Sequence, residues 1–386
     1  MPTFIHHLDA HCALGLGLEA SVAGVLAAQQ PVTELAFDQQ RDPVRMPYCV
    51  LPEDTSGDDF YQYLERICAR ALDGLSAQQR QRTALLLGSS SFDMQVAEAR
   101  YRDDLARRGP EQAVPMPIVG YGKLAQHLGN RFGLSQQRHS YSTACTSSAN
   151  AILYGHRLLS AGLADYALVL GVERFNHTSV LGFHGLGLIS PTQRMRPFAR
   201  ERDGLLLGEA VGTVLLGRGT PAAGAPRLRL CGGAIGTDNH SLTAANTDGQ
   251  QLAQVIQLAL ADSDLNPQDV VGVKVHGTAS LKNDEAEAAA MTTAFGGSIP
   301  PAFALKPFVG HTLGACGALE VALTLGCLSQ GTLPANPGIE PDAALAVTLN
   351  QSVQAARPGP YLFNCFAFGG NNNALIISLE GEGDTP

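Results

Sequence analysis

The segment Ser142-Thr-Ala-Cys145-Thr-Ser-Ser-Ala-Asn150 leads into a stretch whose apolar residues, among them Ile152 and Leu159, have the spacing of one helix face. The segment Gly310-His311-Thr-Leu-Gly-Ala leads in the same way into a stretch rich in small residues. In each segment a side chain that could react stands just before a predicted helix. No close sequence repeat is visible, but two halves of similar design that face each other would bring these two helix starts together.

The rest of the chain alternates short apolar runs with longer amphipathic stretches, which predicts an α/β fold. We expect strands at 83–88, 167–171, 211–216, 270–275 and 374–379, and helices at 58–75, 120–132, 146–161, 249–263, 284–295 and 314–330. The run from Gly217 to Pro226 is short, polar and rich in Gly and Pro, as linkers are. We therefore expect an N-terminal half at 1–217 and a C-terminal half at 226–381.

Composition narrows the class of protein. Of the 386 residues 45% are apolar and 16% are charged, which indicates a folded chain with a large core rather than a disordered one. The net charge of −9 argues against broad nucleic-acid binding, which needs a basic face. The longest apolar stretch, from Ala318 to Leu328, contains Glu320 and is too short to span a bilayer. With no signal-peptide pattern at the start, we expect a soluble cytoplasmic protein.

Eight cysteines are present and no pair has C-x-x-C spacing, so a zinc or redox motif is not expected, and most should be small core residues. Cys145 differs, because backbone N–H groups and the dipole at a helix start stabilise a thiolate and lower its pKa. A buried cysteine in a turn remains the alternative. His7 and His11 have i, i+4 spacing, but the H-E-x-x-H glutamate and a third ligand are missing, so no metal site is expected.

Two further histidines stand where site residues are common. His276 follows a strand pattern and precedes a glycine, as site residues of α/β proteins do, although a loop histidine is the alternative. Asp284 and Glu287 look like the acidic first turn of the helix that follows. His311 lies in a glycine-rich segment five residues after Lys306, and there a structural histidine is as good an interpretation as a catalytic one.

Two loops complete the set of candidates. Phe366-Ala-Phe368-Gly369-Gly-Asn precedes the last strand and could donate backbone N–H groups to an oxyanion, while it lacks the spacing of a phosphate-binding loop. The basic run in this acidic chain is either a solvated loop or a docking point for an acidic partner; it comprises Arg194, Arg196, Arg200 and Arg202.

Together, and in this order, these segments resemble the elongating β-ketoacyl-acyl-carrier-protein synthases of the thiolase superfamily. The resemblance covers nearly the whole chain and rests on Thr143-Ala-Cys145-Thr-Ser-Ser, Arg196-Pro-Phe-Ala-Arg, Gly208-Glu209, His276-Gly-Thr, Lys306, Gly310-His311-Thr-Leu-Gly-Ala and Phe368-Gly-Gly-Asn. It implies a thiolase-like, five-layer αβαβα fold of two similar halves. It also implies a dimer without cofactor or metal, whose substrates ride on the phosphopantetheine of an acidic acyl carrier protein.

The resemblance further implies a triad of Cys145, His276 and His311. Cys145 would take an acyl group from one carrier protein, and malonyl-carrier protein would lose CO2 and attack the resulting thioester. Neutral histidine N–H groups would stabilise the enolate, and the backbone N–H groups of Cys145 and Phe368, in the gate loop with Gly369, would stabilise the oxyanion. Lys306 would tune the histidines, with Asp284, Glu287 and Glu320 as supporting residues. We expect His311→Ala to spare acylation more than condensation.

Two other functions stay open from the sequence. A non-catalytic chain-length-factor subunit of a heterodimeric ketosynthase commonly lacks the cysteine that is kept here. A coenzyme A-dependent thiolase would use a second cysteine near the C-terminal loop, where we interpret Cys365 as packing. Departures from the family pattern favour a specialised polyketide or aryl-polyene-type member over primary fatty-acid synthesis; they are Ala279, Pro307, Ala367, Asn371 and a short stretch between residues 37 and 88.

Overall fold

The computed structural model describes residues 2–37, 44–53, 59–112, 121–221 and 224–381. Its N-terminal half holds a mixed sheet in which β1 (Thr3–Cys12) pairs antiparallel with β9 (Ala210–Arg218), and β9 pairs antiparallel with β7 (Tyr166–Glu173). From β7 the sheet continues in parallel through β5 (Thr83–Gly88) to β6 (Arg138–Tyr141).

The C-terminal half repeats this pattern strand by strand. β10 (Leu228–Thr237) pairs antiparallel with β16 (Asn371–Leu379), and β16 pairs antiparallel with β15 (Gly359–Phe366). The sheet then continues in parallel through β11 (Gly272–Lys274) to β12 (Ala302–Phe303). The two sheets meet at a short antiparallel pairing of β1 with β10. The prediction of two similar halves is confirmed.

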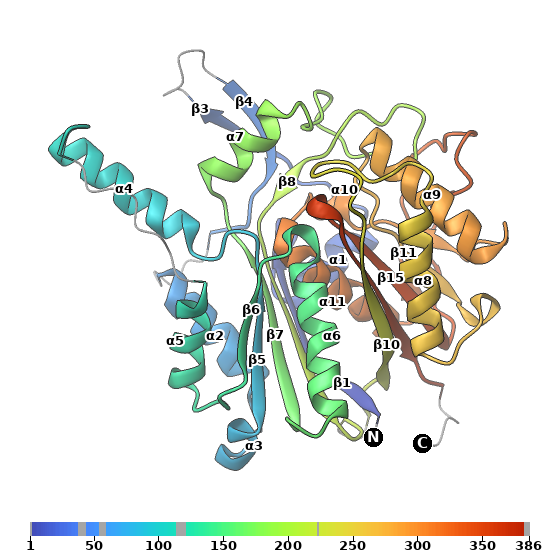
Figure 1. The fold of residues 1–386 in the computed structure, drawn as a ribbon, viewed down its shortest axis with the longest axis horizontal. Coiled ribbons are helices and arrows are strands. Elements are labelled where there is room, and N and C mark those ends of the chain that lie inside the picture. The colour runs from blue at the N-terminus through green and yellow to red at the C-terminus, as the bar shows by residue number, and fades with distance from the viewer. Residues whose placement is uncertain (1, 38–43, 54–58, 113–120, 222–223, 382–386) are drawn as a thin grey trace.

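Helices form three layers around the two sheets (Figure 1). α6 (Ser147–Ser160) contacts β5 and β7 of the first sheet as well as β10 and β16 of the second, and α11 (Cys316–Ser329) packs against α6, β9 and β1. α2 (Phe60–Ala71) and α5 (Gly122–Arg131) cover the outer side of the first sheet, and α8 (Gln250–Asp262) with α9 (Leu281–Phe295) covers the outer side of the second. The result is the predicted thiolase-like αβαβα order.

The remaining elements are short or peripheral. A small sheet joins β3 (Thr33–Phe37), β4 (Val44–Cys49) and β8 (Leu207–Gly208), and α4 (Met94–Arg108) projects from the body of the molecule (Figure 1). The others are α1 (Leu18–Leu26), α3 (Ala77–Gln81), α7 (His177–Gly185), α10 (Lys306–Val309), β2 (Gly15–Leu16), β13 (Thr332–Leu333) and β14 (Gln354–Ala355). Within the described ranges no helix is both long enough and apolar enough to cross a bilayer.

The expected elements are present with shifted ends. The strands predicted at 83–88, 167–171, 211–216 and 374–379 are confirmed, whereas the one at 270–275 is shortened to Gly272–Lys274. All six predicted helices occur, although residues 58 and 120, the expected starts of two of them, lie outside the described residues. β9 ends at Arg218 and β10 begins at Leu228. We keep 1–217 and 226–381 as the proposed limits of the halves, with residues 222–223 outside the described part.

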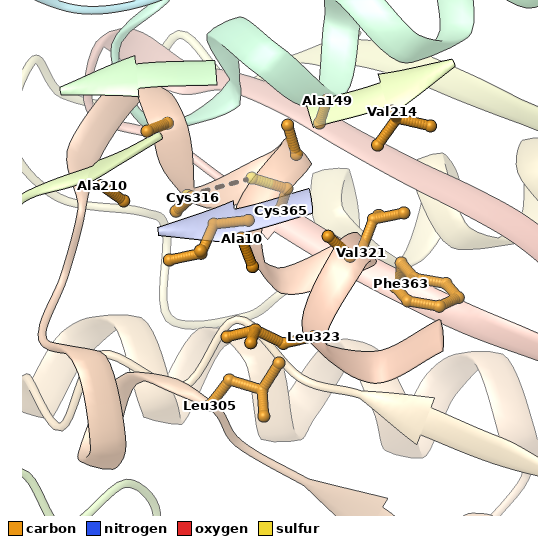
Figure 2. Packing of buried hydrophobic residues seen from close by; sticks show 14 of the residues in the cluster. Ala10, Ala149, Ala210, Val214, Leu305, Cys316, Val321, Leu323, Phe363 and Cys365 are labelled. Carbon is orange, nitrogen blue, oxygen red and sulfur yellow. Dashed lines mark hydrogen bonds between the residues drawn. The ribbon is translucent and has the colours of Figure 1, made fainter. Parts of the chain in front are cut away.

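Buried side chains form three clusters: one between the two sheets and one on the outer side of each sheet. On β5 the alternation of a strand is visible, because Leu85 and Leu87 pack outward against α2 and α5 while Ala84 and Leu86 face the central layer. Around α11 the central cluster gathers residues from both halves, as Figure 2 shows for Ala10 and Val214 of the N-terminal half beside Val321 of the C-terminal half. Every residue of α11 from Cys316 to Leu328 is buried. This explains why its sequence is apolar on all sides.

The two central helices approach each other at their N-terminal ends. A β-carbon added to Gly317, in the first turn of α11, would lie 2.4 Å from the backbone nitrogen of Ala149 in α6. Only a residue without a side chain permits this distance. Because Cys145 and His311 stand just before these two helices, the approach of the helices also sets the distance between the two side chains.

We predict that Gly317→Ala lowers the free energy of unfolding by about 1–3 kcal/mol, because the new methyl group must push α6 and α11 apart. The matched control is Gly182→Ala in α7, where an added β-carbon meets no atom within 4 Å. This control should leave stability unchanged or raise it by up to about 1 kcal/mol. Urea unfolding of both variants measures the difference, and equal stabilities would contradict the tight helix contact.

Candidate active site

Cys145 lies at a helix start, as predicted. The 3-10 turn Ala144–Thr146 leads directly into α6, and Cys145 is 5% exposed. Ala144 adopts a left-handed φ of 51°, a strained conformation for a residue other than glycine. The Ser147 hydroxyl donates a hydrogen bond of 2.6 Å to the Ala144 carbonyl, and this bond holds the turn.

The structure brings both predicted histidines to Cys145. His311 precedes the 3-10 turn Leu313–Ala315 and α11, and its Nε2 lies 3.0 Å from Cys145 Sγ. His276, which follows β11, faces His311 edge-on with 5.5 Å between ring centroids and 84° between ring planes. All three side chains are buried. The two helix starts inferred from the sequence therefore do meet, one from each half.

Lys306 fixes the tautomer of His276. Its Nζ donates to the His276 carbonyl at 2.7 Å and to Glu320 Oε1 at 2.7 Å, and it lies 3.2 Å from His276 Nδ1. Because an ammonium group can only donate, Nδ1 of His276 accepts and its proton is on Nε2. That Nε2–H is the group that a substrate in the site would meet.

A buried charge network supports Lys306. Glu320 also binds Lys274, whose Nζ lies 2.5 Å from Oε2; sequence reasoning did not single out Lys274. Burial opposes charge on both lysine and glutamate, but the mutual attraction prevails: it raises the pKa of Lys306 and lowers the pKa of Glu320. The network therefore keeps a fixed positive charge beside the two histidines.

Burial and this charge decide the ionisation of the site. Burial first, and then the charge on Lys306, lowers the pKa of His276 and of His311 well below the usual value, so both rings are neutral at physiological pH. Burial also raises the pKa of the Cys145 thiol, although Lys306 and a hydrogen bond from the Phe368 backbone act against it. The lowered pKa expected from the helix start is therefore wrong. A thiol that keeps its proton needs a base, and His311 Nε2 is in contact with it.

The loop of Phe368 and Gly369 closes one side of the site. The Phe368 backbone N–H donates a hydrogen bond to the Cys145 side chain. The Phe368 ring stacks on the Phe183 ring, with the ring centroids 5.7 Å apart. Gly369 has φ 76° and donates its N–H to the Leu242 carbonyl at 2.8 Å. A cavity of about 310 Å³ reaches Cys145 between these groups, and its lining includes Phe183, Lys282, Phe366, Phe368, His276 and His311.

Asp284 lies in the first turn of α9, as expected, and Glu287 follows in the same helix. Both side chains are buried, and they accept backbone hydrogen bonds from the neighbouring loops. Glu287 binds the N–H groups of His276 and Gly277 at 2.7 and 2.8 Å, and Asp284 binds those of Phe198 and Thr278. Burial raises the pKa of Asp284 to about 7. Both carboxylates orient the segment that carries His276.

Only some side chains of the basic run are exposed to solvent, where a partner could bind them. Arg202 is buried and binds Asp342 and Glu285, so it cannot dock a partner. Arg196 is half-buried and paired with Glu201 and Asp203. Arg194 and Arg200 are exposed. The candidate docking residues therefore reduce to these two.

Sequence reasoning also missed a buried acid and the surroundings of two cysteines. Glu173, at the end of β7, accepts hydrogen bonds from Ser90 N–H, from Gly314 N–H and from the Ser91 hydroxyl, and so ties both halves together below Cys145. Its position at the end of a strand was the available signal. Cys365 and Cys316 lie behind Cys145, where their thiols donate to its carbonyl.

We predict that Glu320→Gln lowers the free energy of unfolding by about 3–5 kcal/mol, because it leaves two buried lysines without a counter-charge. Since the pKa of Glu320 is lowered by folding, its contribution is present above the usual glutamate range and is lost as the pH falls. The gap between wild type and variant should therefore narrow in acid. Denaturant unfolding at several pH values measures this. Glu34→Gln, which breaks an exposed pair with Arg45, is the control and should cost less than about 1 kcal/mol.

The comparisons with known proteins agree with this geometry. Residues 51–222 match the Beta-ketoacyl synthase, N-terminal domain, and residues 229–340 match the Beta-ketoacyl synthase, C-terminal domain. Over 297 residues the chain is 30% identical to 3-oxoacyl-[acyl-carrier-protein] synthase 2 of Mycobacterium tuberculosis, an alignment that covers 71% of this chain and 69% of the relative. The corresponding protein of Mycobacterium leprae is 29% identical over 298 residues, with the same coverage of both chains.

Solved structures match over almost the full length. The complex of a ketosynthase (ApeO) with its chain length factor (ApeC) from Xenorhabdus doucetiae contains a chain with 26% identity and a TM-score of 0.83, covering 98% of both chains. A chain of the type II polyketide synthase complex AntDE:AntF has a TM-score of 0.86 at 19% identity, covers 99% of this chain and 100% of that one, and shows the fold alone. The chain belongs to the β-ketoacyl synthase family.

Proposed function

We propose that the protein is a β-ketoacyl-acyl-carrier-protein synthase that loads an acyl group on Cys145 and condenses it with malonyl-carrier protein. The observation that carries this proposal is the 3.0 Å contact of Cys145 Sγ with His311 Nε2, beside His276 in a cavity of about 310 Å³. The relative with 30% identity is named for this reaction. No cofactor is needed, since the substrates bring the thioester and the carboxylate that leaves as CO2.

In the loading step His311 is the base. The Cys145 thiol gives its proton to Nε2, and the thiolate attacks the carbonyl carbon of the incoming thioester. A new carbon–sulfur bond to Cys145 forms while the bond to the carrier's sulfur breaks, and that sulfur takes the proton back from His311. The Phe368 N–H that lies on Cys145 can donate to the oxygen that becomes negative, an interaction typically worth about 10²–10³ in rate.

In the condensation step neutral histidines act as donors. Malonyl-carrier protein loses CO2, and negative charge develops on its thioester oxygen while its α-carbon attacks the acyl group on Cys145. His276 is ready to donate from Nε2 because Lys306 occupies the side of Nδ1. His311 accepts at Nε2 during loading, with its own proton on Nδ1, so it must carry that proton on Nε2 to donate in this step. The Nε2–H tautomer leaves Nδ1, which has no partner among the described residues, as an unpaired acceptor rather than an unpaired donor.

Lys306, Glu320 and Glu287 would act as positioning residues. Lys306 and Glu287 bind the His276 carbonyl and N–H respectively, so they hold its backbone from two sides. Burial first, and then the positive charge of Lys306, lowers the pKa of both histidines, so both rings are neutral before each step begins.

We propose an acyl carrier protein as partner and a dimer as the functional unit. Carrier proteins are acidic, which gives the exposed Arg194 and Arg200 a use at the surface. The second subunit would be another copy or a ketosynthase-like partner, and the ApeO complex with its chain length factor supports the latter arrangement. A specialised polyketide or aryl-polyene-type pathway is the finer proposal, and it depends on which acyl donors are accepted.

The same complex is the reason to consider a non-catalytic chain length factor as the second candidate. The assembled contact of Cys145, His276 and His311 favours the catalytic subunit instead. A thiolase that uses coenzyme A is disfavoured by the place of Cys365, whose thiol donates to the Cys145 carbonyl rather than into the cavity.

We predict that the purified protein gains the mass of an acyl group when incubated with acyl-carrier proteins, and that Cys145→Ala gains none. Malonyl-carrier protein should then discharge the acyl group as a β-ketoacyl product. Intact-protein mass spectrometry with a panel of donors measures both steps and gives the chain-length preference. Cys231→Ala, a half-buried cysteine outside the cavity, is the control. Absence of acylation by every donor would support the chain-length-factor alternative.

We predict that the two histidines differ. His276→Ala should load acyl groups at nearly the wild-type rate but slow condensation by roughly 10²–10³, since it removes a donor to the enolate. His311→Ala should slow both steps, because His311 Nε2 touches Cys145; the contact thus adds a loading defect to the expectation that acylation is spared more than condensation. Single-turnover loading and discharge assays separate the steps, and normal loading by His311→Ala would contradict its role as base.

A further inference from the structure

Two buried thiols meet the backbone directly behind Cys145. Cys316 begins α11 and Cys365 lies in β15, and their sulfurs are 3.7 Å apart, as the dashed line in Figure 2 marks. Cys316 Sγ lies 3.0 Å from the carbonyl oxygen of Cys145, and Cys365 Sγ lies 3.1 Å from the same oxygen. The Cys145 carbonyl oxygen thus accepts one hydrogen bond from a thiol in α11 and one from a thiol in β15, both in the C-terminal half.

The chemistry of these groups allows both hydrogen bonds at once. A carbonyl oxygen has two lone pairs, and each thiol has one proton to donate. Burial raises the pKa of Cys316 well above the usual value, so its thiol keeps its proton. With both protons directed to the oxygen, the two sulfurs touch each other without needing a bond between them.

Both peptide groups that flank Cys145 are therefore held. On the N-terminal side the Ser147 hydroxyl holds the Ala144 carbonyl at 2.6 Å, and with it the N–H of Cys145. On the C-terminal side the two thiols hold the Cys145 carbonyl. Fixing both peptide planes fixes the direction of the Cys145 side chain, which has to place Sγ within 3.0 Å of His311 Nε2.

We propose that Cys316 and Cys365 are positioning residues, whose thiols hold the Cys145 carbonyl so that its sulfur stays in contact with His311. This rests on the proposed function only in that Cys145 is the nucleophile. Neither thiol lines the cavity, and neither reacts. A misplacement of the nucleophile of about 1 Å can cost on the order of 10²-fold in rate, so two weak bonds can matter for catalysis.

The test compares two double variants and one single variant of the protein. Cys316→Ala with Cys365→Ala removes both donors, and Cys316→Ser with Cys365→Ser keeps a donor at each place. Cys327→Ala, in the same buried helix and away from Cys145, is the control for loss of a buried sulfur. Two rates are measured by mass spectrometry with peptide mapping: alkylation of Cys145 by iodoacetamide, and its acylation by an acyl-carrier protein.

We expect the double alanine variant to slow both rates on the order of 10- to 100-fold, the double serine variant to recover most of this loss, and Cys327→Ala to react like the wild type. Wild-type rates in the double alanine variant would overturn the proposal. Equal losses in the alanine and serine variants would also overturn it, since packing and not donation would then be responsible. Should the double alanine variant not fold, the single alanine and serine variants at each position decide by the same comparison.

Alkylation needs no acyl donor, so failure of the proposed function gives a different result from failure of this inference. A protein that no carrier acylates, but whose Cys145 alkylation depends on the two thiols, would retain the positioning role and lose the synthase assignment. A protein that is acylated normally in all variants would retain the assignment and lose the positioning role.

Discussion

The contact between the N-terminal ends of α6 and α11 is the constraint on which the site depends. Each helix follows a loop of its own half, and each loop carries one partner of the pair formed by Cys145 and His311. The helices can come this close because Gly317 has no side chain to meet Ala149. Neither half contains the pair alone, so the site exists only when the central layer is assembled.

A second constraint is electrostatic. The buried network of Lys274, Glu320 and Lys306 places charge where water is excluded, which is costly unless each group is paired. Here the pairing leaves one net positive charge next to two histidines. Burial and, after it, this charge keep the histidines neutral, while negative charge that develops on a nearby sulfur or oxygen is stabilised. One buried network thus serves both the loading and the condensation chemistry.

The sequence predicted the residues that meet in the site, because each carried a local signal: a small-residue helix start for Cys145, a strand end for His276 and a glycine-rich loop for His311. It predicted the fold class from alternation, but three of the long strands, β1, β10 and β15, escaped. β10 contains an arginine and three glycines. β1 carries three histidines and an aspartate, and β15 contains a proline and an asparagine, so neither has a continuous apolar run. Their burial is produced by neighbours in the sheets, which a local pattern does not contain.

Other misses have the same origin in distant contacts. Arg202 looked like part of an exposed basic run, but its partners Glu285 and Asp342 are 83 and 140 residues away. The direction of the Cys145 pKa was reversed for a related reason. The helix start is visible in the sequence, while the burial that outweighs it comes from the packing of two halves. Which distant residues form ion pairs, and how deeply a side chain is buried, are decided only when the layers are assembled.

The departures from the family pattern are accommodated where they occur. Ala367 has an extended backbone with φ −129°, which any residue adopts, so it places no strain on the loop of Phe368. Pro307 lies in the first turn of α10, where the missing N–H costs nothing. Of these departures only Ala279 has a left-handed φ, of 60°, and this conformation costs roughly 1–2 kcal/mol.

Asn371 is not only tolerated at its position but also makes hydrogen bonds next to Cys145. Its side-chain oxygen lies 2.8 Å from the Thr146 hydroxyl and 2.8 Å from the amide of Asn150, so it ties the first residue of β16 to the start of α6. The C-terminal half therefore holds the segment of Cys145 at two places: the polar contacts of Asn371 beside it and the two thiols behind it. One departure from the family pattern, Asn371, thus acts on the same turn as the two thiols, and this turn is the part of the molecule where small displacements have the largest chemical effect.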